Sequence, residues 1–155
     1  MKYLLVVLLS LAVTSSWADA SPRALALEQF PAQVRELVGK KILEARTALK
    51  DVPSNKRRED DRGLFVNLLG VNYDVTLGKK AETVEWLALR SPPQHAKGLY
   101  EKIMEKYANS AMIKDVQVGG PAPGHYIEVS FPDEGVQFRF MSSNKDLFSV
   151  VVQRK

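Results

Sequence analysis

The histidines His95 and His125 are the side chains best suited to acid–base or metal chemistry near neutral pH, because the chain contains no cysteine. The same absence excludes a disulfide and a thiolate nucleophile. His125 and Glu128 have the spacing of a ligand pair, but side chains at that separation point to opposite faces of a β-strand. We therefore expect neither a bound metal nor a cofactor.

Ser142 and Lys145 match the S-x-x-K pattern of some serine hydrolases. That chemistry needs the serine at the start of a helix, whereas these two residues lie in a short turn between two predicted strands. A hydrolase that uses His125 or His95 together with carboxylates is consequently the least favoured function.

Polar side chains on two successive strands suggest a binding surface. In HYIEVSF, strand alternation places Tyr126 and Glu128 on the polar face, and in VQFRFM it does the same for Gln137 and Arg139, so the four residues can form one mixed patch. An aromatic ring beside charged and amide groups suits a protein partner. Polar side chains are also the default on a solvated sheet face, so this candidate patch is a hypothesis.

The segment GGPAPG, residues 119–124, connects two predicted strands. Phosphate-binding loops of this composition lead into a helix, whose amide dipoles face the anion, and here a strand follows. We expect Gly119, Gly120, Gly124 and His125 to form the rim of any binding surface at that end of the sheet.

Hydrophobic periodicity predicts the elements that must position these residues. Residues 30–53 and 91–110 have the apolar spacing of amphipathic helices, and Ser91 and Gln94 form a capping-box pair in the second. Residues 54–63 read as a charged solvated loop. Strand alternation follows both helices, and it places Tyr73 and Trp86 in the core.

These elements predict a two-layer α+β fold with an antiparallel sheet of about six to seven strands and two helices, in the order α-β-β-(β)-α-β-β-β-β. A helix followed by hairpins occurs twice in this order. The pattern allows a diverged duplication, although the residues show no self-similarity.

Residues 1–20 are typical of a secretory signal peptide cleaved after Ala20, with Lys2, an apolar run and the triplet Ala-Asp-Ala. The apolar run is about half as long as the roughly twenty residues that span a bilayer. We expect residues 21–29 to form a flexible arm and residues 30–155 to form a single domain, with no transmembrane anchor in the mature chain. A periplasmic or secreted location follows, and the missing cysteines favour a bacterial periplasm.

The net charge of +4 is small and both signs are mixed along the chain, so nucleic acid is not an expected partner. The sequence favours a non-enzymatic binding protein of the bacterial envelope, of an inhibitor, immunity or accessory type, whose partner is another envelope protein. The alternative is a carrier that holds a small apolar ligand between sheet and helices, in a pocket lined by Trp86, Tyr100 and Phe138.

Overall fold

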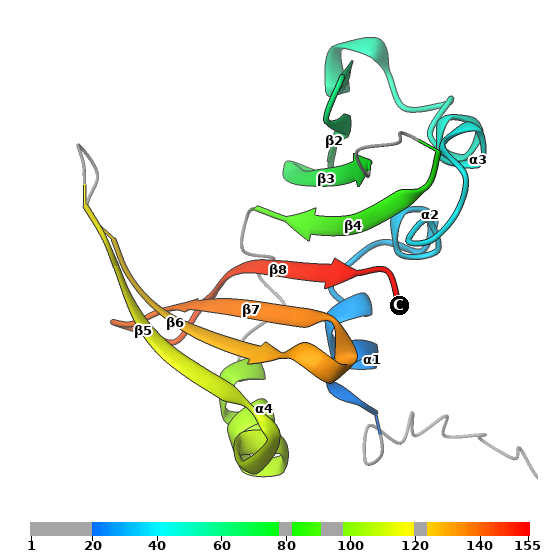
Figure 1. The fold of residues 1–155 in the computed structure, drawn as a ribbon. Coiled ribbons are helices and arrows are strands. Elements are labelled where there is room, and N and C mark those ends of the chain that lie inside the picture. The colour runs from blue at the N-terminus through cyan, green and yellow to red at the C-terminus, as the bar shows by residue number, and fades with distance from the viewer. Residues whose placement is uncertain (1–19, 78–81, 91–97, 120–123) are drawn as a thin grey trace, which may run out of the picture.

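The computed structural model describes residues 20–77, 82–90, 98–119 and 124–155. These residues form eight strands, four α-helices and three short 3₁₀ helices (Figure 1). The helices are α1 (Pro22–Leu27), α2 (Ala32–Arg35), α3 (Ile42–Ala48) and α4 (Leu99–Tyr107), and the 3₁₀ helices are η2 (Ser54–Lys56), η4 (Ala108–Ser110) and η5 (Pro132–Glu134). The strands are β1 (Arg57–Asp60), β2 (Gly63–Leu68), β3 (Val71–Leu77), β4 (Val84–Leu89), β5 (Met112–Val118), β6 (Gly124–Phe131), β7 (Val136–Met141) and β8 (Leu147–Gln153).

All eight described strands belong to one antiparallel sheet in the order β1-β2-β3-β4-β8-β7-β6-β5. The predicted α+β class is confirmed, but the predicted number of strands was too low. The additional strand is β1, which lies in the segment that we expected to be a charged loop and pairs with β2. Charged side chains are common on edge strands, because they discourage pairing with other chains.

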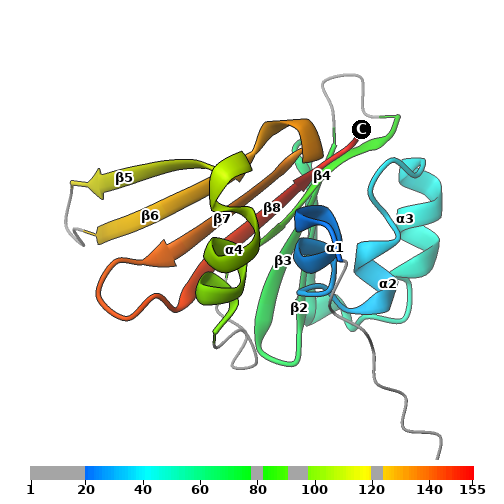
Figure 2. The same ribbon diagram turned by 90° about the horizontal axis from the view of Figure 1, so that it is seen from below.

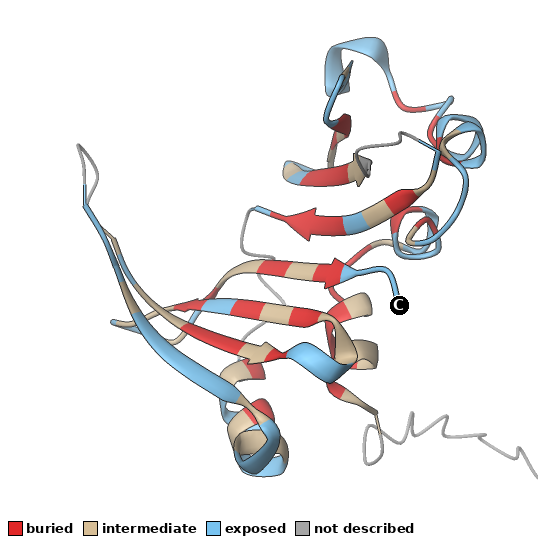
Figure 3. Ribbon diagram, viewed as in Figure 1, coloured by how far each residue is buried: buried red, intermediate tan, exposed pale blue. Residues whose placement is uncertain are grey.

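The four described α-helices lie on the same face of the sheet (Figure 2). Apolar residues of the helices and of both halves of the sheet form one buried cluster, which includes Val34, Ile103, Leu87 and Phe138, each fully buried. Buried residues are most frequent in the central strands, whereas β5 is mainly exposed (Figure 3). The opposite face of the sheet, called here the uncovered face, has no helix from the described residues over it.

The single helix predicted over residues 30–53 is two short helices, α2 and α3. The chain turns between them at Gly39, whose φ of 81° is a left-handed conformation that glycine adopts without strain. The backbone then pairs with the start of β4: the N–H of Gly39 donates to the carbonyl of Val84, and the N–H of Val84 donates to that of Lys40, both at 2.8 Å. Pairing with a strand therefore replaces the helical hydrogen bonds that the periodicity predicted.

Residues 21–29 were expected to form a flexible arm, and this expectation was wrong. They contain α1, in which the Ser21 hydroxyl accepts a hydrogen bond from the Ala24 amide and Pro22 occupies the first turn. Leu25 and Ala26 are buried in the core, and Arg23 donates to the carbonyl of Glu134 at 2.8 Å. Burial of these apolar side chains offsets the entropy lost on ordering the segment.

The predicted second helix is described from Leu99 onward as α4, preceded by Gly98 with a φ of 74°. Its predicted capping box, Ser91 with Gln94, and the candidate His95 lie outside the described residues. In the part of the chain that the structure describes, no helix combines the length and apolar character needed to cross a bilayer.

Tyr73 is buried as predicted, but Trp86 is 42% exposed on the uncovered face. A β-bulge explains the difference. Thr76 pairs with Trp86 and Leu77 pairs with Val84, so one extra residue stands in β4 and the alternation reverses there. Leu87, not Trp86, consequently faces the helices.

From α3 onward the described elements form two repeats. The series α3, η2 and β1–β4 is followed by α4, η4 and β5–β8, with η5 inserted between β6 and β7. Every residue pair between β7 and β8 has residue numbers 63 higher than a pair between β3 and β4, as Tyr73–Leu89 and Val136–Val152 illustrate. The bulges coincide as well, at Thr76/Leu77 and Arg139/Phe140. The strand register therefore repeats in the backbone, as the hypothesis of a diverged duplication predicts.

One row of directly paired residues crosses all eight described strands on the uncovered face and is called here the central row. The two repeats meet at its midpoint, where Ala88 pairs with its own equivalent, Val151. The row runs Arg58, Phe65, Asp74, Ala88, Val151, Gln137, Ser130 and Met112.

We expect Leu87→Ala to lower the free energy of unfolding by about 2–5 kcal/mol, because it leaves a cavity under the helices. The neighbouring Trp86→Ala is the control and should cost about 1 kcal/mol, since that ring is partly solvated. Urea unfolding followed by circular dichroism measures both values. A larger loss for Trp86→Ala would show that the alternation does not reverse at the bulge.

Candidate functional site

The four residues of the candidate patch lie on adjacent strands of the uncovered face. Glu128 of β6 is directly opposite Arg139 of β7, and the guanidinium Nε lies 3.1 Å from the carboxylate Oε2. Tyr126 and Gln137 occupy the same face in the neighbouring pairs of the two strands. The structure thus brings together all four residues that strand alternation selected.

The patch is more closely packed than the sequence indicated. Glu128 is buried, with its carboxylate under the half-exposed side chain of Arg139. Tyr126 is half-buried, and its ring stacks on that of Phe148 with centroids 4.6 Å apart. The patch therefore presents an arginine and an aromatic pair that are held in place before any partner arrives.

The predicted rim is described at Gly119, Gly124 and His125, whereas Gly120 lies outside the described residues. The ring of Tyr126 lies against Gly124, so a side chain at that position would collide with it. His125 is exposed, and its Nε2 lies 2.5 Å from the Oδ1 of Asp115 on β5. Tyr126 therefore belongs to the patch and also contacts Gly124 of the rim.

Asp115, His125 and Ser142 line one open cavity of about 530 Å³ at this rim. The contacts do not assemble a nucleophile and its base. The Ser142 hydroxyl oxygen is buried and has no hydrogen-bond partner among the described residues, while the Ser142 amide donates to the carbonyl of His125 at 3.0 Å. Lys145 donates to the Ser142 carbonyl at 2.8 Å, so both candidate bases contact backbone or carboxylate atoms.

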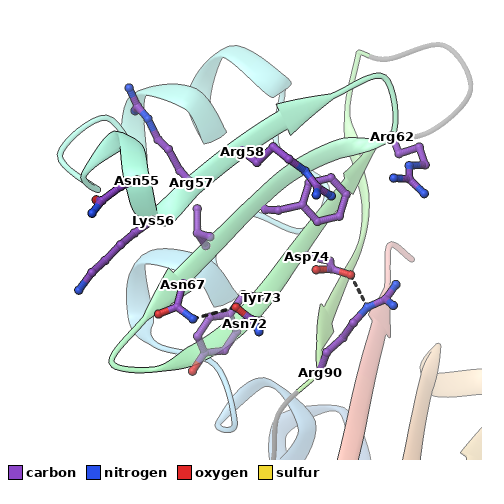
Figure 4. A pocket seen from close by; sticks show the side chains of 12 residues that line it. Asn55, Lys56, Arg57, Arg58, Arg62, Asn67, Asn72, Tyr73, Asp74 and Arg90 are labelled. Atoms are coloured by element: carbon purple, nitrogen blue, oxygen red, sulfur yellow. Dashed lines mark hydrogen bonds and ion pairs between the residues drawn. The ribbon is translucent and has the colours of Figure 1, made fainter. Parts of the chain in front are cut away.

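A second cavity, called here the arginine cavity, lies at the other end of the sheet and was not predicted. It has a volume of about 480 Å³ and is formed by η2, β1, the β1–β2 turn, β2, β3 and the residue that follows β4 (Figure 4). It is lined by Asn55, Lys56, Arg57, Arg58, Arg62, Phe65, Val66, Asn67, Asn72, Tyr73, Asp74 and Arg90.

Two guanidinium groups of the arginine cavity gather over one aromatic ring. The Cζ of Arg58 lies 4.5 Å from the ring centroid of Phe65, and that of Arg62 lies 5.9 Å from it. Both arginines also approach Asp60, at 3.6 and 3.3 Å. The backbone N–H of Arg62 donates to Asp60 and, with the nearby guanidinium charges, lowers the pKa of that carboxyl.

The opposite wall of the arginine cavity holds Arg90, which forms an ion pair with the buried Asp74 (Figure 4). Beside it, the Asn67 amide donates to the Asn72 side-chain oxygen at 2.8 Å. Arg57 is directed elsewhere, because it donates to the carbonyls at the end of α3. The cavity thus combines guanidinium groups on two walls with side-chain amides.

Sequence reasoning missed the arginine cavity for two reasons. The run KRREDDR suggested a solvated loop, so its charges were not assigned to a sheet face. Arg90 reaches the cavity only because β3 and β4 pair, which brings its backbone N–H to the carbonyl of Asn72. Strand alternation in β1 and β2 was the one available signal, since it puts Arg58 and Phe65 on a common face.

The pocket expected for a small-ligand carrier is not formed by the residues that were predicted to line it. Phe138 is fully buried under the helices, whereas Trp86 lies on the uncovered face. A smaller cavity of about 360 Å³ does lie beside α3, with Leu49 and Leu64 in its floor. Both leucines are almost completely buried, so they offer little apolar surface to a ligand.

Comparison with protein-family models, with curated protein sequences and with solved structures finds no match to the chain. Among the described residues, no group of three or more histidine and carboxylate side chains is placed to hold a metal ion.

We expect Arg139→Ala to lower the free energy of unfolding by about 1–3 kcal/mol, because it leaves the buried Glu128 carboxylate without its partner. The double variant Glu128→Gln, Arg139→Gln should recover most of this loss, since two amides can pair across the strands. Thermal and urea unfolding test both values. A double variant as unstable as Arg139→Ala would show that the ion pair is not the cause.

Burial raises the pKa of the Tyr73 phenol above its usual value of 10.0. The stabilisation from the neutral phenol is therefore complete below pH 10 and is lost as the pH rises through the folded-state pKa. We expect Tyr73→Phe to remain folded at a higher pH than the unmodified chain. Circular dichroism between about pH 9 and 12 measures the pH at which each chain unfolds, with Tyr126→Phe as the control. An equal rise in that pH for both variants would contradict the role given to Tyr73.

Proposed function

We propose that the protein is an exported, non-enzymatic binding protein of the bacterial envelope, and that it recognises another envelope protein through the uncovered face of its sheet. The observation that carries the proposal is the patch around the Glu128–Arg139 pair, where a half-exposed arginine and a stacked tyrosine lie on paired strands. Arginine and large aromatic residues contribute most of the binding energy in protein interfaces.

The composition of the rest of the uncovered face supports the same proposal. Trp86 is 42% exposed there, and Met112 at the edge is 50% exposed. Tryptophan and methionine are enriched in interfaces relative to the remaining protein surface. Because these side chains project from a hydrogen-bonded sheet, binding would cost little additional backbone entropy.

Export is supported by the sequence of residues 1–20 together with the place where the described fold begins. Ser21 is the N-cap of α1, and Pro22 is its first residue. Cleavage after Ala20 would therefore leave every described helix and strand intact. The Tyr107 hydroxyl, which donates to the Ala20 carbonyl, would lose that one contact.

The test compares two variants that each replace an ion pair by two amides and leave the net charge unchanged. Glu128→Gln with Arg139→Gln alters the patch, and Arg46→Gln with Glu59→Gln alters an exposed pair, 2.5 Å apart, that links α3 to β1. The chain is expressed in a bacterial host with residues 1–20 in place. Proteins cross-linked to it in the periplasmic fraction are then quantified by mass spectrometry.

We expect the recovered chain to begin at Ser21. The amount of cross-linked partner recovered with the patch variant should be at least about tenfold lower than with the unmodified chain. The control variant should retain the partner. Equal recovery by both variants would contradict the patch as the binding surface, and recovery of the chain only in the cytoplasm would contradict export. Equal melting temperatures for the two variants would exclude a difference caused by unfolding.

A further inference from the structure

The two repeats allow three charged residues of the arginine cavity, Arg58, Asp74 and Arg90, to be compared with their structural equivalents in the same molecule. In the central row, the positions of Arg58 and Asp74 correspond to those of Met112 and Gln137. The position of Arg90 corresponds to Gln153, because their amides donate to the equivalent carbonyls of Asn72 and Gly135. All the equivalents in the second repeat are uncharged.

The two repeats have the same strand pairing but different side chains at these positions. The second repeat forms the same four-stranded meander with methionine and glutamine at these positions, so strand pairing does not demand charges there. The ion pair between Arg90 and Asp74 is likewise absent from the equivalent described positions, Gln153 and Gln137. The strand pairing that the two repeats share therefore does not account for the charges of Arg58, Asp74 and Arg90.

The balance of charge in the arginine cavity favours an anionic ligand. Its lining contains five cationic side chains, including Arg58, Arg62 and Arg90, and one carboxylate, Asp74. When Arg57, which is directed to the end of α3, is left out and Asp60 beside Arg58 and Arg62 is included, an excess of two positive charges remains. A phosphate monoester carries about two negative charges at neutral pH and matches this excess better than a single carboxylate.

The remaining groups indicate what is attached to the phosphate. A volume of about 480 Å³ exceeds the size of inorganic phosphate and is typical of sites for small organic ligands. Asn67 and Asn72 are hydrogen-bonded to each other, which orients an amide oxygen and an amide N–H at the cavity wall. Amides of this kind bind hydroxyl groups, which accept and donate hydrogen bonds.

We propose that the arginine cavity binds a phosphorylated sugar, with the phosphate at Arg58, Arg62 and Arg90 and the sugar hydroxyls at Asn67 and Asn72. The sugar phosphate can be a free molecule or the head group of a glycolipid, because the cavity is open to solvent. This site goes beyond the proposed protein-binding function. It lies toward the other end of the uncovered face, where Ala88 and Val151 separate Asp74 of the cavity from Gln137 of the patch in the central row.

The experiment measures binding to the purified chain by isothermal titration calorimetry at low salt. Glucose 6-phosphate is compared with inorganic phosphate, with glucose and with a poly-glutamate peptide. Vesicles of phosphatidylcholine with and without monophosphoryl lipid A form a second arm, measured by co-sedimentation. Binding in the first arm identifies a soluble ligand, and binding in the second arm alone identifies a lipid head group.

The test variant is Arg58→Met with Arg62→Gln, in which Arg58 takes the residue found at its equivalent position. The matched control is Arg35→Met with Lys40→Gln, which removes two exposed charges from the helix-covered side of the molecule. We expect the test variant to bind the sugar phosphate at least about tenfold more weakly and the control variant to bind it unchanged.

Three results would overturn the proposal. If inorganic phosphate binds as tightly as glucose 6-phosphate, the sugar hydroxyls do not contribute to binding. If the poly-glutamate peptide binds more tightly than glucose 6-phosphate, the cavity recognises acidic polypeptides instead. If the test and control variants lose the same affinity for glucose 6-phosphate, the loss is caused by the change in net charge and not by the cavity. None of these measurements involves the protein partner. A failure of the sugar-phosphate proposal is therefore distinguishable from a failure of the proposed protein-binding function.

Discussion

The pairing of β4 with β8 is the constraint on which the rest of the structure depends. Only four residue pairs join these strands, yet they connect two four-stranded meanders into one sheet. Four side chains at this junction point toward the helices and are fully buried: Leu87 and Leu89 of β4, and Val150 and Val152 of β8. The hydrophobic core and the alignment of the two repeats therefore depend on the same short register.

Because all four described α-helices cover one face, the two faces of the sheet have separate roles. The covered face provides stability through apolar burial, and the two repeats are alike there. On the uncovered face the repeats differ: one end carries the arginine cavity, and the other carries the stacked tyrosine and the Glu128–Arg139 pair. The difference between the repeats on the uncovered face is the basis of both functional proposals.

Strand alternation predicted the candidate patch well, because β6 and β7 are regular where it lies and a period of two assigns each side chain to a face. The same rule failed for Trp86, since a bulge inserts one residue into β4 and reverses the alternation. The arginine cavity could not be predicted, because Arg90 and Arg58 are far apart in the sequence and meet only through the pairing of four strands.

The amino-acid sequence by itself determined the α+β class, seven of the eight described strands and the faces of the regular strands, because these depend on local periodicity and turn residues. Tertiary structure decided the break between α2 and α3, the ordering of α1 and the position of the two repeats about Ala88 and Val151. Each of these depends on contacts between distant segments, and such contacts can outweigh local preference.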